Sequence, residues 1–85
     1  MIEIKYTESD KIRLTITPNR VTLKIKNGTN EEILQKYVDY TNQIIKDFKP
    51  TKSYRGTFRP HFRTGVIGIS LQNNNRDESV YFELK

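Results

Sequence analysis

The first 26 residues alternate between apolar and polar side chains with a period of two. Because successive side chains of a β-strand point to opposite faces, this pattern predicts strands that bury one face. Two polar breaks interrupt the alternation, at residues 8–10 and 18–20, and both have the length of a hairpin turn. We therefore expect a three-stranded antiparallel meander, with strands at about residues 2–7, 11–17 and 20–26.

A helical periodicity follows the meander. Apolar residues after Glu32 recur at intervals of three and four, and polar residues occupy the opposite side. Thr29 stands three residues before Glu32, which is the spacing of a capping box. Pro50 ends the helix, because the residue before a proline avoids the helical conformation. The sequence predicts an amphipathic helix over about residues 30–48, whose apolar stripe covers the apolar face of the strands.

The last third of the chain predicts further strands. A basic strand and loop occupy about residues 53–64, where Gly56 weakens the strand and Pro60 is expected to end it. Two cleaner alternating segments follow at about residues 66–72 and 79–84, joined by a polar loop. The expected fold is a single α+β domain over residues 1–85. In it, the N-terminal meander, one long amphipathic helix and two or three more antiparallel strands form one sheet packed against the helix.

Positive charge is concentrated in one stretch of the sequence. The formal net charge is +5, with 15 Lys and Arg against 10 Asp and Glu. Residues 48–76 hold six basic residues and no acidic one, whereas residues 1–47 balance to +1 and residues 77–85 to −2. Such an asymmetry indicates an anionic partner.

Arginine and aromatic residues alternate in YRGTFRPHFRTG, residues 54–65. Arginine donates two parallel hydrogen bonds to a phosphate, and aromatic rings stack on bases of any identity. In one interpretation the segment is a groove for single-stranded nucleic acid. In the other, the aromatic residues complete a small core and the arginines keep one strand face soluble. Strand alternation would turn Tyr54 and Phe58 inward, which makes Phe62, beyond the proline, the main candidate for stacking.

We expect two basic binding regions. The first is the nucleic-acid site of the acid-free segment, with candidate residues Lys49, Lys52, Arg55, Arg59, His61, Phe62, Arg63 and Arg76. The second is the polar face of the meander, with Lys5, Lys11, Arg13, Lys24 and Lys26. A basic sheet face commonly contacts phosphates, although lysine on exposed strands also guards against edge-to-edge aggregation.

These features predict a small, non-enzymatic nucleic-acid-binding domain that takes single-stranded DNA or RNA with little sequence specificity. One alternative is a protein-interaction module, such as a regulator, inhibitor or assembly subunit, that places the same basic patch on an acidic partner. Another is a metal-independent ribonuclease in which His61 acts as acid or base. We expect no metal and no cofactor, because the chain has no cysteine, one histidine and no glycine-rich phosphate loop.

The composition also suggests where such a chain would act. The lack of cysteine, the lack of a long apolar run and the polar residues 1–14 favour a cytoplasmic protein without a membrane partner. Abundant Asn, Lys and Ile are typical of AT-rich genomes, and the small size fits a virus or mobile element as readily as a cell. Open sheet edges and a small core predict a homodimer.

Overall fold

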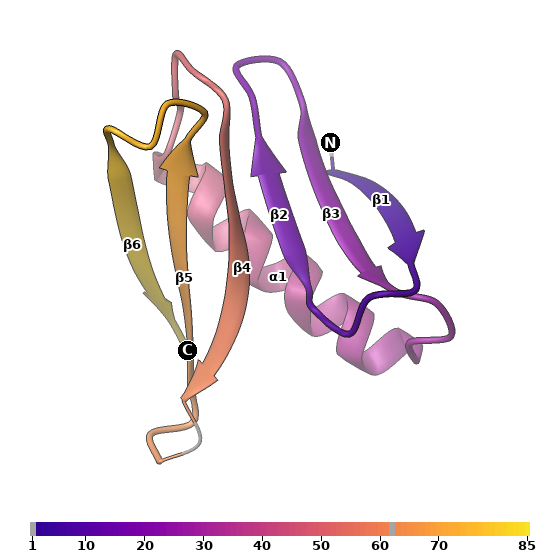
Figure 1. The fold of residues 1–85 in the computed structure, drawn as a ribbon. Coiled ribbons are helices and arrows are strands. Elements are labelled where there is room, and N and C mark those ends of the chain that lie inside the picture. Colours follow the sequence, from indigo (N-terminus) through magenta and orange to yellow (C-terminus); the bar gives the residue numbers. More distant parts are fainter. Residues whose placement is uncertain (1, 62) are drawn as a thin grey trace.

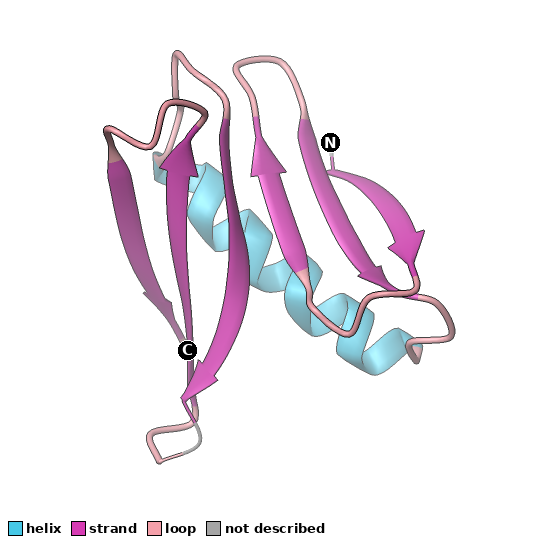
Figure 2. Ribbon diagram, viewed as in Figure 1, coloured by secondary structure: helices cyan, strands magenta, loops and turns pink. Residues whose placement is uncertain are grey.

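Six strands form one sheet, and a single helix lies across one of its faces (Figures 1 and 2). This computed structural model describes residues 2–61 and 63–85, with His61 as backbone only. No helix in those residues is both long and apolar enough to cross a bilayer. The elements are β1 (Ile2–Thr7), β2 (Arg13–Ile16), β3 (Val21–Lys26), α1 (Glu31–Asp47), β4 (Tyr54–His61), β5 (Val66–Asn73) and β6 (Ser79–Leu84).

The sheet confirms the α+β class but not the N-terminal meander. Its strand order is β1-β3-β2-β4-β5-β6, and β1 pairs with β3 in parallel, so that Ile4 lies opposite Leu23. Every other neighbouring pair is antiparallel. The predicted meander is therefore wrong, because β3, and not β2, lies between the other two N-terminal strands.

The connection between β1 and β2 explains this arrangement. Its residues 8–12 cross the end of β3 instead of closing a tight hairpin (Figure 1). The backbone nitrogen of Asn27 donates to the carbonyl oxygen of Thr7 over 2.8 Å, and the Lys26 ammonium lies 2.6 Å from the Asp10 carboxylate. These contacts hold the crossing segment against the end of β3. Alternation in the sequence specifies which face a residue occupies, but it does not specify the neighbouring strand.

α1 occupies almost the residues predicted for it, but the residue that caps its N-terminus differs from the predicted one. Asn30 is the N-cap, and its side-chain oxygen accepts a hydrogen bond of 3.0 Å from the backbone nitrogen of Ile33. Thr29, the predicted cap, instead donates its hydroxyl to the Lys26 carbonyl oxygen over 2.7 Å. Asparagine is at least as good an N-cap as threonine, so the helix begins one residue later than the capping-box spacing indicates.

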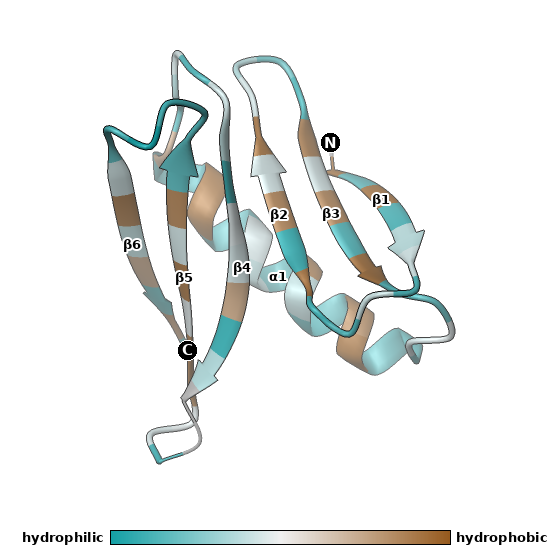
Figure 3. Ribbon diagram, in the orientation of Figure 1, coloured by the Kyte–Doolittle hydropathy of each residue, from teal (hydrophilic) through white to brown (hydrophobic). Residues whose placement is uncertain are grey.

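The aromatic residues of β4 belong to the core between sheet and helix. Tyr54 is 7% exposed and Phe58 is 5% exposed. The Phe58 ring meets that of Tyr37 edge-on, with centroids 5.2 Å apart, and the Tyr54 ring meets that of Phe48 in the same way at 5.2 Å. Apolar residues recur along the strands and along the helix (Figure 3). Both inner aromatics of the basic segment are therefore packing residues.

Pro60 lies inside β4, although the sequence predicts that it ends the strand. The backbone nitrogen of Phe58 donates to the Ile12 carbonyl oxygen over 2.9 Å, so that nitrogen points toward β2. The nitrogen of Pro60, two residues further, points to the same side, where β2 no longer runs alongside. No ladder hydrogen bond is lost there, which is why a proline is tolerated. On its other side β4 continues to pair with β5, and Pro60 lies opposite Ile67.

Candidate nucleic-acid interface

The helix α1 lies across one face of the sheet (Figure 1). Strand alternation places the cations of the central strands on the opposite face. Over the described part of the chain, no helix covers this face. Along β2, β3 and β4, alternation turns the buried apolar residues toward α1 and the intervening polar residues outward. We call this surface the basic face and define it by Arg13, Lys24, Lys26, Arg55 and Arg59.

Within the strands, as far as the described residues go, acidic residues lie on this side of the sheet only in the two edge strands, and Asp10 of the β1–β2 connection reaches it at Lys26. Glu3 lies in β1 and Glu83 lies in β6. Glu3 is engaged with Lys5 and Arg20, each at 3.6 Å. Where their side chains are described, the four inner strands present only basic, hydroxyl, amide, glycine and apolar residues, so the positive charge lies along the middle of the face.

Most cations of the basic face lack a carboxylate partner. Lys26 is the exception, because its ammonium pairs with Asp10. Among the described residues, none of the other four forms an ion pair. Unneutralised arginines and lysines side by side repel one another, and a bound polyanion would remove that repulsion.

Threonines separate the arginines in a regular way. Across β2 and β4, Arg13 lies opposite Thr57, and Thr15 lies opposite Arg55. Each long cation therefore stands beside a short hydroxyl side chain, which leaves space above the sheet. Arginine and threonine side chains are both common donors to phosphate oxygens.

This alternation of long and short side chains produces two adjoining hollows. The first, which we call the β2–β4 hollow, measures about 390 Å³. The second lies over β4 and β5, measures about 380 Å³, and shares Arg55, Gly56 and Thr57 with the first. The β2–β4 hollow is lined by Arg13, Leu14, Thr15, Lys24, Arg55, Gly56, Thr57 and Arg76. The second hollow is lined by Arg55, Gly56, Thr57, Arg59, Ser70 and Gln72.

The structure thus brings together candidates from both predicted regions. Arg55 of the acid-free segment and Arg13 and Lys24 of the meander line a single hollow. Arg76, from the turn between β5 and β6, lines it as well. These members of the two basic regions, separate in the sequence, lie on one continuous surface because β2 pairs with β4.

Other predicted site residues lie elsewhere. Lys52 is paired with Glu78 at 3.3 Å, and Lys49 follows α1 on the opposite side of the sheet. Arg63 is exposed in the turn between β4 and β5. Lys5 is paired with Glu3 on an edge strand, and Lys11 is exposed in the connection before β2. Phe62 and the side chain of His61 lie outside the described residues.

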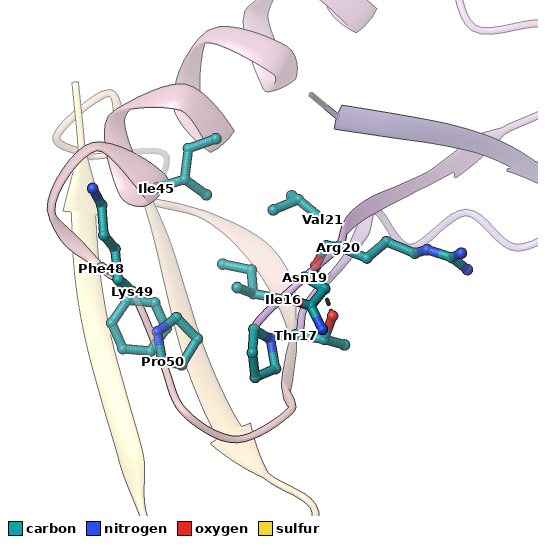
Figure 4. A pocket seen from close by; sticks show the side chains of 10 residues that line it. Ile16, Thr17, Asn19, Arg20, Val21, Ile45, Phe48, Lys49 and Pro50 are labelled. Atoms are coloured by element: carbon teal, nitrogen blue, oxygen red, sulfur yellow. Dashed lines mark hydrogen bonds between the residues drawn. The ribbon is translucent and has the colours of Figure 1, made fainter.

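A third hollow, near Lys49, has a different character. It measures about 290 Å³ and lies between the β2–β3 turn and the end of α1. Its walls include Ile16, Val21 and Phe48, and the charged ends of Arg20 and Lys49 point away from it (Figure 4). We interpret it as an incompletely filled junction of helix and turn, because its cations do not converge.

Tyr81 is a surface aromatic that the sequence reasoning did not select. It lies in β6 opposite Ser70, and it is 54% exposed. Its neighbours Val80 and Phe82 turn toward the helix side, so the alternation itself places Tyr81 on the side of the basic face. Attention to the outward positions of that strand would have identified it.

Two ionisable groups near the start of β4 are coupled by a hydrogen bond. The Tyr54 hydroxyl donates to the Glu78 carboxylate, and this bond, together with the nearby Lys52 ammonium, lowers the pKa of Glu78 below its ordinary value. The same bond raises the pKa of Tyr54, with burial as a further cause. The Glu78 carboxylate is thus shared between the Tyr54 hydroxyl and the Lys52 ammonium, which lies 3.3 Å away.

Within the described residues, no group of three or more histidine or acidic side chains could hold a metal ion. The arrangement of the basic face is suited to binding an anion through several cations and hydroxyls at once. No protein-family model, curated protein or solved structure matches this chain.

Proposed function

We propose that this protein is a small, non-enzymatic binder of single-stranded DNA or RNA, with little sequence specificity, and that it binds through the basic face. The observation that carries the proposal is a set of four cations on adjacent inner strands, Arg13, Lys24, Arg55 and Arg59, which have no ion-pair partner and no carboxylate between them among the described residues. Contacts from such groups go to phosphates, which are the same in every sequence.

The width of the face favours a single strand over a duplex. Six strands span five spacings of about 4.8 Å, which is about 24 Å from β1 to β6. The major groove of DNA is about 12 Å wide, so the sheet cannot enter it. A single strand can instead lie across the sheet, with its phosphates on the cations. The exposed Tyr81 ring offers a base a stacking surface, a contact worth about 1–3 kcal/mol.

Fluorescence anisotropy with labelled single strands of ~12 nucleotides tests the proposal, since sites of ~4–16 nucleotides are common in such binders. We expect binding at low salt that weakens steeply between ~50 and ~200 mM. The combined variant Arg13→Gln, Arg55→Gln, Arg59→Gln removes three phosphate contacts. It should reduce the slope of log K against log salt by about 2, because each contact to a single strand contributes about 0.7.

A matched variant distinguishes the effect of the basic face on binding from the effect of net charge alone. Lys36→Gln, Lys46→Gln, Lys49→Gln removes the same three charges from α1 and the residues just after it, on the helix side of the sheet. It should retain most of the wild-type affinity. Equal losses in the two triple variants, or no binding at low salt, would overturn the proposal. Failure with oligonucleotides combined with binding of an acidic protein surface would indicate the interaction module instead.

The proposal includes no catalysis. RNA incubated with the protein in chelator should stay intact over hours. Cleavage that disappears in His61→Ala would establish the ribonuclease in place of the binder.

Self-association and origin remain predictions alongside the proposed binding. β1 and β6 are the two edge strands of the sheet, and an unpaired edge favours contact with a second copy. We expect a homodimer, and a monomer mass by light scattering at high concentration would contradict it. A cytoplasmic location and a viral or mobile-element origin also stay predictions.

A further inference from the structure

The β2–β4 hollow holds more positive charge than is needed to neutralise one backbone phosphate. Four cations from four different segments line it, namely Arg13, Lys24, Arg55 and Arg76. None of the four forms an ion pair with a described carboxylate. A phosphodiester carries one negative charge, so a strand running through the hollow would leave several of these cations unneutralised.

Arg76 is held at the hollow by a defined turn. Its backbone nitrogen donates to the Asn73 carbonyl oxygen over 3.0 Å. Asn73 is itself 3% exposed, and its side-chain oxygen accepts from the backbone nitrogens of Asp77 and Glu78, at 3.1 and 3.3 Å. Asn73 thus fixes the turn that positions Arg76.

The backbone at Arg76 is unusual for an arginine. Its φ of 60° lies in the left-handed region, which favours glycine or asparagine in hairpin turns. Three asparagines precede it, and any of them would suit that conformation better. The sequence therefore holds an arginine where the local backbone does not favour one, and its side chain lines the hollow over β2 and β4.

A phosphomonoester fits this charge better than a diester does. At neutral pH it carries between −1.5 and −2 charges and presents three acceptor oxygens, by analogy with a phosphorylated side chain. Arginine guanidinium groups donate two parallel hydrogen bonds to such a group. The hollow, at about 390 Å³, also falls within the ~300–1,000 Å³ of small-ligand sites, so it is larger than a phosphate alone requires.

We propose that the β2–β4 hollow is a subsite for the terminal phosphomonoester of a nucleic-acid strand. This inference rests on the proposed function. The terminal nucleotide occupies the hollow, and the strand continues across β4 into the second hollow, where Arg59, Ser70 and Gln72 meet the next phosphates. The protein therefore binds strand ends in preference to internal sequence.

The test compares three oligonucleotides of one sequence, with a 5′-phosphate, a 3′-phosphate or hydroxyls at both ends. Competition anisotropy measures the three affinities at one salt concentration. We expect one phosphorylated form to bind about tenfold or more tightly than the hydroxyl form, which is the effect of one added charged hydrogen bond. The form that gains affinity identifies which end the hollow takes.

Two variants test whether the preference for a terminal phosphate arises at the β2–β4 hollow. Arg76→Gly suits the left-handed backbone and should keep the fold, so the loss of the phosphate preference in this variant reflects the lost side chain. Arg59→Gln removes one charge outside the β2–β4 hollow. It should weaken all three oligonucleotides alike and leave their ratio unchanged.

The outcomes distinguish the two proposals. Equal binding of all three oligonucleotides would overturn the terminal subsite and leave single-strand binding intact. A phosphate preference that survives Arg76→Gly would also overturn the assignment to this hollow. Absence of binding by every oligonucleotide would overturn the proposed function, and the subsite with it.

Discussion

Arg13 lies directly opposite Lys24 in the antiparallel pair of β2 and β3. Neither side chain has an ion-pair partner among the described residues. On its other side Lys24 lies opposite Lys5 of the neighbouring strand β1. Like charges directly opposite each other destabilise a sheet, by about 0.2–1 kcal/mol per pair. We therefore expect the basic face to lower the stability of the free protein.

We predict that Lys24→Gln raises the free energy of unfolding by about 0.2–1 kcal/mol at low salt. The gain should shrink in ~1 M salt, where the Debye length falls to ~3 Å. Urea unfolding of both proteins at the two salt concentrations measures the difference. Lys36→Gln, on the exposed side of α1, is the control and should show no comparable gain. A destabilised Lys24→Gln would mean that the lysine contributes packing instead of repulsion.

Gly56 is required by the close approach of β4 and β5. A Cβ atom at this position would lie 2.3 Å from the Ser70 carbonyl oxygen and 3.1 Å from the Leu71 Cδ2 atom. We expect Gly56→Ala to lower the free energy of unfolding by about 1–3 kcal/mol, the usual cost of overpacking. Chemical denaturation measures the loss. The neighbouring Thr57→Ala, which shortens a side chain on the basic face, should cost less. Equal effects would contradict the steric explanation.

The helix cap offers a direct comparison of two adjacent residues. Asn30→Ala removes the acceptor for the Ile33 backbone nitrogen and should lower the free energy of unfolding by about 1 kcal/mol. Thr29→Ala removes only the hydroxyl bond to Lys26 and should cost less. Thermal unfolding followed by circular dichroism ranks the two. A larger loss for Thr29→Ala would restore the capping-box interpretation.

Glu78 should contribute a pH-dependent part of the stability. Its pKa in the folded state is lowered, first by the Tyr54 hydroxyl and then by Lys52. The stabilisation is therefore present above the ordinary glutamate pKa of about 4.3 and is lost as the pH falls through the lower folded pKa. Glu78→Gln should be less stable than the wild type at neutral pH, and the difference should vanish in acid. In a Tyr54→Phe background the difference should be smaller, because the first cause is gone.

Much of the fold followed from periodicity in the sequence. Period-two segments located the strands, and the helical stripe after Glu32 located α1 to within a residue or two. The pairing of β1 with β3 did not follow, because alternation determines faces and leaves strand order open. The extension of β4 through Pro60 was also missed. A proline is excluded from a strand only where its nitrogen faces a paired neighbour. β2 no longer runs alongside β4 at Pro60, so the nitrogen of Pro60 faces no paired strand there.

The candidate site was predicted in pieces. Charge counting selected Arg55 and Arg59 in one region and Arg13 and Lys24 in another. These residues lie on one surface only because β2 pairs with β4, and no local sequence pattern encodes that long-range contact. Arg76 was chosen for its charge alone, and only the turn built on Asn73 places it at the hollow. Lys52 was chosen on the same ground, and the structure pairs it with Glu78 at 3.3 Å.

The parallel pairing of β1 with β3 has a consequence for assembly of the chain. β1 precedes β3 in the chain, so it is synthesised before its partner, which is complete only at Lys26. We expect β2 and β3 to form their local hairpin first and β1 to join it afterwards, because local contacts form faster than long-range ones. β1 is a six-residue edge strand whose only neighbour in the sheet is β3, so its detachment would leave the β2–β3 hairpin paired. Exchange of this strand between two copies would give a swapped dimer, with β1 of each chain completing the sheet of the other.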